Sequence, residues 1–90
     1  MLKILDDLIL LVRERKKSAP EQSYTKKLLN DKVLITEKVK EEIKELVESV
    51  ENNSNKIHET ADVLYHLIVY LEANQIKIED VMEELNKRKK

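Results

Sequence analysis

The chain has 90 residues, of which 39% are charged, yet its formal net charge is only −1. A near-neutral chain lacks the basic excess that is typical of nucleic-acid-binding domains. There is no cysteine and no glycine, which excludes a disulfide framework, a thiolate zinc site and every glycine-rich phosphate loop. This length predicts a single domain over residues 1–90.

Five helical segments are expected from the 3.6-residue repeat of apolar side chains, at about residues 2–17, 23–30, 32–51, 55–73 and 78–88. The only proline, Pro20, ends the first segment, and Ser23 is a suitable N-cap for the short second one. The sequence NNSN ends the long third helix, because Asn and Ser favour turns. The predicted fold class is therefore all-α, a small bundle of four to five helices.

The apolar start of the chain, MLKILDDLILLVRERKK, contains Asp6 and Asp7 and is followed by basic residues. A signal peptide has the opposite order, and no run of about 18 apolar residues predicts a membrane span. The absence of cysteine agrees with a reducing compartment. We therefore expect a cytoplasmic protein that has neither a membrane nor a nucleic acid as its partner.

The helix expected at 32–51 combines an apolar stripe with an acidic flank. The stripe consists of Val39, Ile43, Leu46, Val47 and Val50. At about 100° per residue, Glu42 and Glu45 lie on one flank of this stripe, together with Lys38. Glu41 points nearly opposite the stripe. Glu42 and Glu45 are thus the pair expected beside the bundle interior, with Glu41 outside.

The helix expected at 55–73 is apolar over most of its circumference, which predicts a buried helix. One apolar side of this helix is formed by Ile57, Ala61, Leu64, Ile68 and Leu71, the last four of which lie within about 40° of Ile57 around the helix axis. Its only polar line consists of Glu59, Asp62 and His66, away from Ile57. Further apolar side chains exceed what one short chain can cover, so at least a dimer is expected; they are Val63, Leu67 and Tyr70.

Acids on these two helices can face each other across the bundle. Four inward carboxylates repel unless a cation lies between them, and hard oxygen ligands in that number suit Mg²⁺ or, as a substitute, Mn²⁺. For Asp62 a salt bridge to a lysine or a helix-capping role is the alternative. His66 is expected to be a satisfied interior histidine rather than a ligand. Glu48 and Glu51 are expected on the solvated surface.

Three segments together resemble the phosphoribosyl-ATP pyrophosphohydrolase family: PEQSYTKKLL at 20–29, KVKEEIKELV at 38–47 and ETADVLYHLIVYL at 59–71. The closing segment, IKIEDVMEELNKRKK, also looks like the end of that family's chains. SYT followed by LL is the element that points to this family. The acid pattern alone points only to the wider MazG-type superfamily of all-α nucleoside triphosphate pyrophosphohydrolases.

The resemblance implies a MazG-like dimer with a four-helix-type core. It implies Mg²⁺-dependent hydrolysis of phosphoribosyl-ATP to phosphoribosyl-AMP and pyrophosphate, the second step of histidine biosynthesis. By position it implies metal-binding catalytic acids at Glu42, Glu45, Glu59 and Asp62, with Glu41 orienting water. It also implies substrate contacts by Ser23, Tyr24, Thr25 and Lys38, with the basic residues Arg13, Arg15 and Lys16 nearby.

The chain departs from the family at several positions. Lys40 stands where the family usually has glycine, and Ile43 where it usually has alanine. A loop glycine is missing, and residues 30–40 are about one residue short. Two alternatives therefore stay open, a MazG-type house-cleaning nucleoside triphosphate pyrophosphohydrolase and a catalytically inactive helical dimer. Taken alone, the basic cluster near the end of the first helix is more often a solvated helix terminus, although its residues could bind phosphates.

Overall fold

The computed structural model describes residues 2–18 and 22–89, and within these ranges all regular structure is helical. The five helices are α1 (Lys3–Lys17), α2 (Tyr24–Leu29), α3 (Lys32–Glu51), α4 (Lys56–Ala73) and α5 (Ile78–Arg88). The predicted fold class is confirmed, and the helix bounds agree closely with the periodicity of the sequence. The predicted helix-ending role of Pro20 lies outside the described residues.

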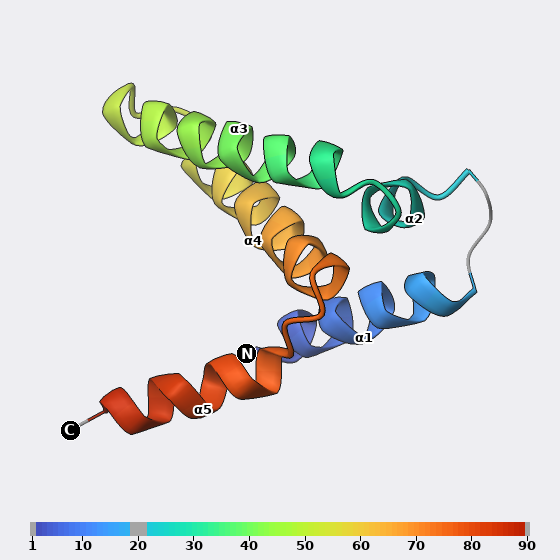
Figure 1. Ribbon diagram of the computed structural model, residues 1–90. Helices are drawn as coiled ribbons and strands as arrows, with labels where there is room; N and C mark the ends of the chain where they lie inside the picture. Colours follow the sequence, from blue (N-terminus) through green and yellow to red (C-terminus); the bar gives the residue numbers. More distant parts are fainter. Residues whose placement is uncertain (1, 19–21, 90) are drawn as a thin grey trace.

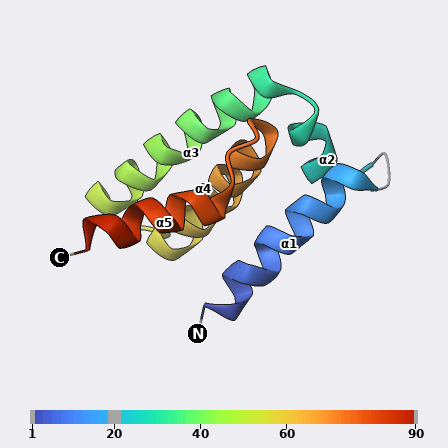
Figure 2. The ribbon, with the colours of Figure 1, turned by 60° about the horizontal axis from the view of Figure 1, so that its bottom comes forward.

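The helices α3 and α4 form an antiparallel hairpin, and this is the main packing unit of the chain (Figure 1). The short α2 contacts α1, α3 and α4, while α1 packs against α2 and α4. The last helix, α5, contributes no buried side chain and lies to one side of the hairpin (Figures 1 and 2). Across the described ranges, no helix combines the length and the apolar character needed to cross a membrane.

The helix ends are built without glycine. At the end of α4 the N–H of Ile76 donates to the carbonyl of Leu71 at 2.9 Å, and Gln75 has a positive φ of 60°. This is the Schellman arrangement, in which glycine is usual at the left-handed position. The end of α3 has the same arrangement, with Asn53 at φ 53°. Asparagine tolerates this conformation, whereas glutamine holds it at a steric cost.

The apolar core is small and lies at one end of the hairpin. Its buried side chains are Val12, Leu28, Leu29, Ile35, Ile68, Val69 and Ala73. They come from α1, α2, the start of α3 and the C-terminal half of α4. The middle of α3 and the first turns of α4 are therefore available for polar groups.

The predicted burial of the α3 stripe holds for Val39, which packs against the core, but is wrong within a single chain for three other residues. Ile43, Val47 and Val50 are 46%, 53% and 57% exposed, whereas Glu42 and Ser49 are buried. The helical wheel correctly groups the residues that share a face, but it does not determine which face meets α4. Here the acidic flank of α3 faces α4, and Ile43, Val47 and Val50 face outward.

The prediction that α4 is buried nearly all round is also wrong for one chain. Ile57 and Leu64, which were expected to be buried with the rest of the helix, are 88% and 44% exposed. Tyr70, which was expected to be surplus surface, packs against the core instead. Among the described residues, the part of α4 that packs into the core is its C-terminal half, with Ile68 and Val69. Ile57 and Leu64 lie nearer the N-terminus of α4, away from that core.

Candidate metal and substrate site

Three carboxylates converge where the middle of α3 meets the first turn of α4. Glu42 and Glu45 lie one turn apart on α3, and Glu59 lies near the start of α4. One oxygen from each of the three residues lies within 4.8 Å of the other two. Glu42 is buried and Glu45 is half-buried, whereas Glu41 is exposed, as the helical wheel predicts.

The three acids are held in an environment that disfavours their negative charges. One carboxylate oxygen of Glu42 and one of Glu59 are buried and have no hydrogen-bond partner among the described residues. Burial raises the pKa of Glu42, and the neighbouring Glu45 carboxylate raises it further. Burial and Glu45 likewise raise the pKa of Glu59. A buried carboxylate oxygen without a hydrogen-bond partner raises the free energy of the folded state, and a positive charge in the cluster would offset this cost.

A divalent cation fits this donor set. Mg²⁺ binds oxygens at about 2.1 Å, so its ligand atoms lie about 3 to 4 Å apart. The observed spacing of the oxygens, within 4.8 Å, needs only a small inward movement of the side chains to reach that range. Carboxylates projecting from facing helices are an established way to hold such ions in helical bundles.

Asp62 lies beside this cluster and not inside it. Its carboxylate is 37% exposed, and its Oδ2 atom is 3.4 Å from Nε2 of His58 one turn earlier. The side chain beside Asp62 is thus a histidine, whereas a lysine was the expected alternative. Oxygens of Glu59 and Asp62 and a ring nitrogen of His58 also lie within 4.8 Å of one another. Glu59 therefore belongs to both groups and links them.

The segment Ser23–Thr25 is fixed against α4 close to these acids. Ser23 caps α2 and accepts a hydrogen bond from the backbone N–H of Lys26 at 3.2 Å. The hydroxyl of Thr25 hydrogen-bonds to Tyr65. The hydroxyl of Tyr24 is 3.2 Å from Nε2 of His66. His66 lies one turn beyond Asp62 on α4, so the predicted substrate segment and the predicted acids share one region.

Lys38 connects this segment to the acids. Its ammonium lies 3.8 Å from the Glu41 carboxylate. Burial raises the pKa of Tyr24, while the nearby positive charge of Lys38 opposes that shift. A half-exposed tyrosine, a lysine and a cluster of acids thus line one surface, which presents both a positive charge for phosphate and donors for a metal.

His66 matches its prediction as a satisfied interior histidine. It is only 6% exposed. Its Nδ1 atom lies 2.8 Å from the carbonyl oxygen of Asp62, and its Nε2 atom contacts the Tyr24 hydroxyl. Sequence reasoning missed Tyr65 as the partner of Thr25, because 40 residues separate the two. The contact between His58 and Asp62 was detectable, since the two residues are four apart on one helix.

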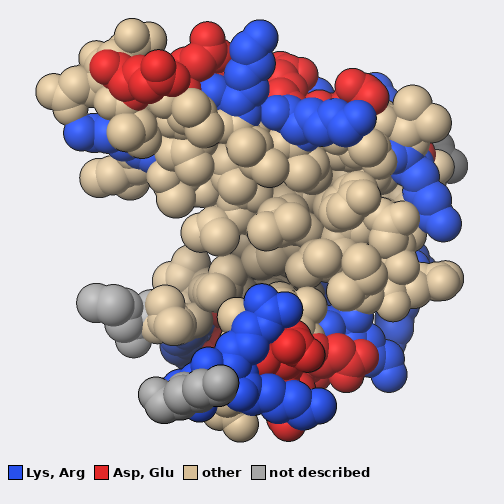
Figure 3. Space-filling view, turned by 60° about the vertical axis from the view of Figure 1, so that its left-hand side comes forward, with Lys and Arg blue, Asp and Glu red and all other residues tan. Residues whose placement is uncertain are grey.

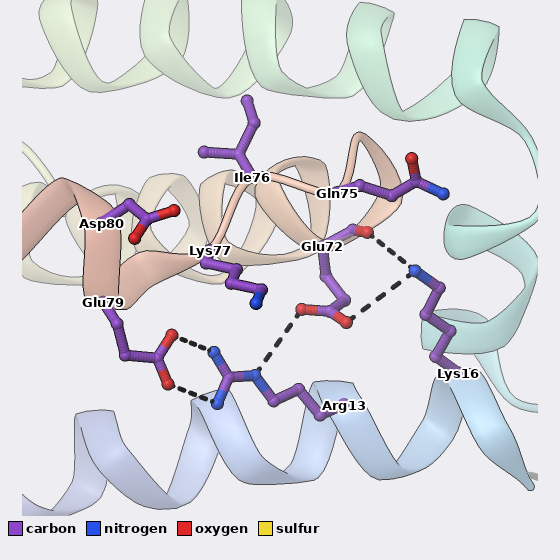
Figure 4. A pocket seen from close by; sticks show the side chains of 8 residues that line it. All are labelled: Arg13, Lys16, Glu72, Gln75, Ile76, Lys77, Glu79 and Asp80. Carbon is purple, nitrogen blue, oxygen red and sulfur yellow. Dashed lines mark hydrogen bonds and ion pairs between the residues drawn. The ribbon is translucent and has the colours of Figure 1, made fainter.

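Two basic residues of α1, Arg13 and Lys16, pair with acidic residues outside this cluster, as Figure 4 shows. The Arg13 guanidinium donates two hydrogen bonds to Glu79, at 2.9 and 2.6 Å, and its Nε atom lies 3.7 Å from Glu72. Lys16 donates to the backbone carbonyl of Glu72 at 3.2 Å. These groups line a pocket of about 670 Å³ between α1 and the turn from α4 to α5.

The substrate role expected for Arg13 and Lys16 stays a prediction, although within one chain both side chains pair away from the acidic cluster. Glu72, to which both pair, is ten residues beyond Asp62, or about 15 Å along α4. The ion pairs link α1 to α4 and α5, and Arg13 lowers the pKa of Glu79 to about 2 through its hydrogen bonds. The role of Arg15 stays a prediction.

An all-α domain with carboxylates converging from two facing helices belongs to the class of helical bundles that build functional sites between helices. The family model for phosphoribosyl-ATP pyrophosphohydrolase matches residues 5–89, and the chain belongs to this family. The resemblance found in the sequence is thereby confirmed.

Named relatives extend this finding. The chain is 36% identical to a phosphoribosyl-ATP pyrophosphatase of Clostridium novyi, over 97% of this chain and 82% of that protein. It is 44% identical to a phosphoribosyl-ATP pyrophosphatase of Allorhizobium ampelinum, over 93% of this chain and 84% of the relative. It is also 46% identical to a histidine biosynthesis trifunctional protein of Kluyveromyces lactis, of which it spans only 9%.

Proposed function

We propose that the chain hydrolyses phosphoribosyl-ATP to phosphoribosyl-AMP and pyrophosphate in histidine biosynthesis, with a divalent cation held by Glu42, Glu45 and Glu59. The family match over residues 5–89 supports the reaction. The observation that carries the metal is the pair of buried carboxylate oxygens without hydrogen-bond partners. The chain has no glycine, so the acids and their cation stand in for a glycine-rich phosphate loop.

The residues around the acids divide the remaining work. When bound, Mg²⁺ neutralises charge on the phosphoryl oxygens and lowers the pKa of a coordinated water. Lys38, beside Glu41 at 3.8 Å, contributes a point charge to a phosphate group. Asp62 adds a carboxylate at the exposed rim of the cluster, next to His58. The segment Ser23–Thr25 binds the nucleoside part.

A homodimer is part of this proposal. The outward stripe of α3, with Ile43, Val47 and Val50, and the exposed Ile57 and Leu64 of α4 leave apolar surface uncovered. In Figure 3 uncharged residues fill the hollow between charged margins. Two such hairpins packed together form a four-helix core. Light scattering at micromolar concentration is expected to give a dimer mass for wild type, and a monomer mass for Val47→Lys. A monomeric wild type contradicts the proposal.

A cytoplasmic location completes the proposal, and its support is the absence of cysteine, which agrees with a reducing compartment. Cell fractionation tests it, and recovery of the protein with an oxidising compartment contradicts it.

The reaction is tested by incubating the pure protein with phosphoribosyl-ATP and Mg²⁺ and measuring pyrophosphate. The expected result is turnover that EDTA abolishes, with much slower cleavage of ATP and other common nucleoside triphosphates. Cleavage of the common triphosphates without turnover of phosphoribosyl-ATP favours the MazG-type alternative. Cleavage of neither compound favours the inactive dimer.

A further inference from the structure

The segment Ser23–Thr25 is attached to α4 through a cluster of three rings. Tyr24 stacks beside Tyr65 with ring centroids 6.4 Å apart, and the His66 ring stands edge-on to both, at 6.1 and 4.9 Å. Edge-to-face contacts of this kind fix ring orientation as well as position. The Thr25 hydroxyl adds a second link, to Tyr65. The Tyr24 ring is thus held in place by more than its own hydroxyl.

The hydrogen bonds of His66 determine the direction of the Tyr24 hydroxyl. The Asp62 carbonyl oxygen, 2.8 Å from Nδ1 of His66, can only accept, so Nδ1 carries the hydrogen. In the neutral ring Nε2 is then an acceptor. The Tyr24 hydroxyl, 3.2 Å from Nε2, must therefore be the donor in this contact.

We infer that His66 is a positioning residue for the substrate: it holds the Tyr24 hydroxyl so that its hydrogen points inward and its lone pairs point toward the nucleotide. Tyr24, which is 46% exposed, then accepts a hydrogen bond from a ribose hydroxyl and does not donate to phosphate. Phosphate is left to Lys38 and the cation site. The inference rests on the proposed function for the identity of the nucleotide.

The same histidine links Tyr24 to the acids. Its Nδ1 atom is bonded to the backbone of Asp62, one turn from Glu59 on α4. The orientation of Tyr24 is therefore set relative to the turn that carries the acidic cluster. A change at this link is expected to alter how the nucleoside is held, and not the affinity of the acids for a cation.

The test compares Tyr24→Phe, His66→Asn and the double variant. The asparagine amide can replace Nδ1 and keep the hydrogen bond to the Asp62 carbonyl, but it has no acceptor at the position of Nε2. Tyr70→Phe is the matched control, because it removes a hydroxyl from the same helix outside the ring cluster. Each variant is assayed for KM and kcat with phosphoribosyl-ATP, and for Mn²⁺ affinity by calorimetry.

Each single variant is expected to raise KM about three- to tenfold, the usual effect of one hydrogen bond, with kcat within about twofold. The double variant is expected to match the single ones, since both remove the same contact. Mn²⁺ affinity is expected to stay at the wild-type value in all three, and Tyr70→Phe to behave as wild type. A wild-type KM in Tyr24→Phe overturns the inference, as do multiplied effects in the double variant or a loss confined to kcat.

Nitrogen-15 NMR of the histidine side chains separates this inference from the proposed function. The expected spectrum has His66 protonated at Nδ1, with an Nε2 shift that moves in Tyr24→Phe while the Nδ1 shift stays. An Nε2 shift that is the same in both proteins overturns the inference whatever the activity. Failure of the wild type to cleave phosphoribosyl-ATP refutes the proposed function alone.

Discussion

Replacing Glu42 with glutamine tests whether the acidic cluster is built for a cation. Glu42 is buried, and burial and the Glu45 carboxylate both raise its pKa. Without a metal the folded state therefore binds a proton at Glu42 more tightly than the unfolded state does. The stability of the metal-free protein falls as the pH rises from the ordinary carboxyl value of 4.5 through the raised value. The Glu42→Gln protein is expected not to lose stability in this way, because glutamine does not ionise.

The size of the effect follows from the geometry. Two unit charges at the 4.8 Å limit of the oxygen spacing repel by about 3.5 kcal/mol at an effective dielectric constant of 20. Protonating one carboxyl with an ordinary pKa of 4.5 at pH 7 costs about 3.4 kcal/mol. The destabilisation by charge repulsion therefore has a similar upper limit, because protonation would relieve any larger repulsion. Solvent around the half-buried Glu45 reduces the repulsion. We expect Glu42→Gln to stabilise the metal-free protein by about 1 to 3 kcal/mol, or at least about 4 °C in Tm.

The assay is thermal unfolding in EDTA at pH 7 and pH 5, at one fixed protein concentration, and then in Mg²⁺ or Mn²⁺. Glu48→Gln is the matched control, because it removes the same charge from an exposed position of α3. Wild type is expected to gain stability from the metal, and Glu42→Gln to gain little. A Glu42→Gln protein that is less stable than wild type in EDTA, or that the metal stabilises equally, refutes the reasoning.

Three further predictions concern other parts of the chain. Asp62→Ala is expected to weaken Mn²⁺ binding in calorimetry, and heats equal to those of wild type count against a metal contact there. Gln75→Gly is expected to raise Tm by about 4 to 8 °C, because it removes roughly 1 kcal/mol of strain from a left-handed backbone conformation. Asn53→Gly is expected to raise Tm by less. A Tm for Gln75→Gly below that of wild type would contradict this prediction. Arg13→Gln is expected to reduce hydrogen-exchange protection in α5 and leave kcat unchanged, and a loss of kcat returns Arg13 to a substrate role. The link from Arg13 to Glu79 is expected to be complete above pH 4.5 and to be lost as the pH falls toward 2.

The sequence predicts the helices well, because apolar periodicity and caps are local signals. Ser23 and the NNSN turn mark helix ends that the structure reproduces. The position of Glu42 and Glu45 on one flank of α3, with Glu41 outside, also follows from helical geometry alone. These features depend on residues only a few positions apart.

Features that depend on distant partners were not predictable in the same way. The bond from Arg13 to Glu79 spans 66 residues, and nothing local distinguishes it from a phosphate-binding arginine. The outward direction of Ile43 and Val47 depends on which face of α3 meets α4, a choice that the period of the sequence does not encode. The proposed homodimer would cover these two residues.

In the proposed function, the converging carboxylates hold the cation on which phosphoribosyl-ATP hydrolysis depends. The most direct measurement is the initial rate of pyrophosphate release from phosphoribosyl-ATP against Mg²⁺ concentration, for wild type, Glu45→Gln and Glu48→Gln. Wild type and Glu48→Gln are expected to show Mg²⁺-dependent turnover. Glu45→Gln is expected to have a rate at least 100-fold lower, which is on the order of the loss of one electrostatic contact at a transition state. Turnover by Glu45→Gln close to that of Glu48→Gln, or turnover by wild type that persists in EDTA, would contradict the proposed function.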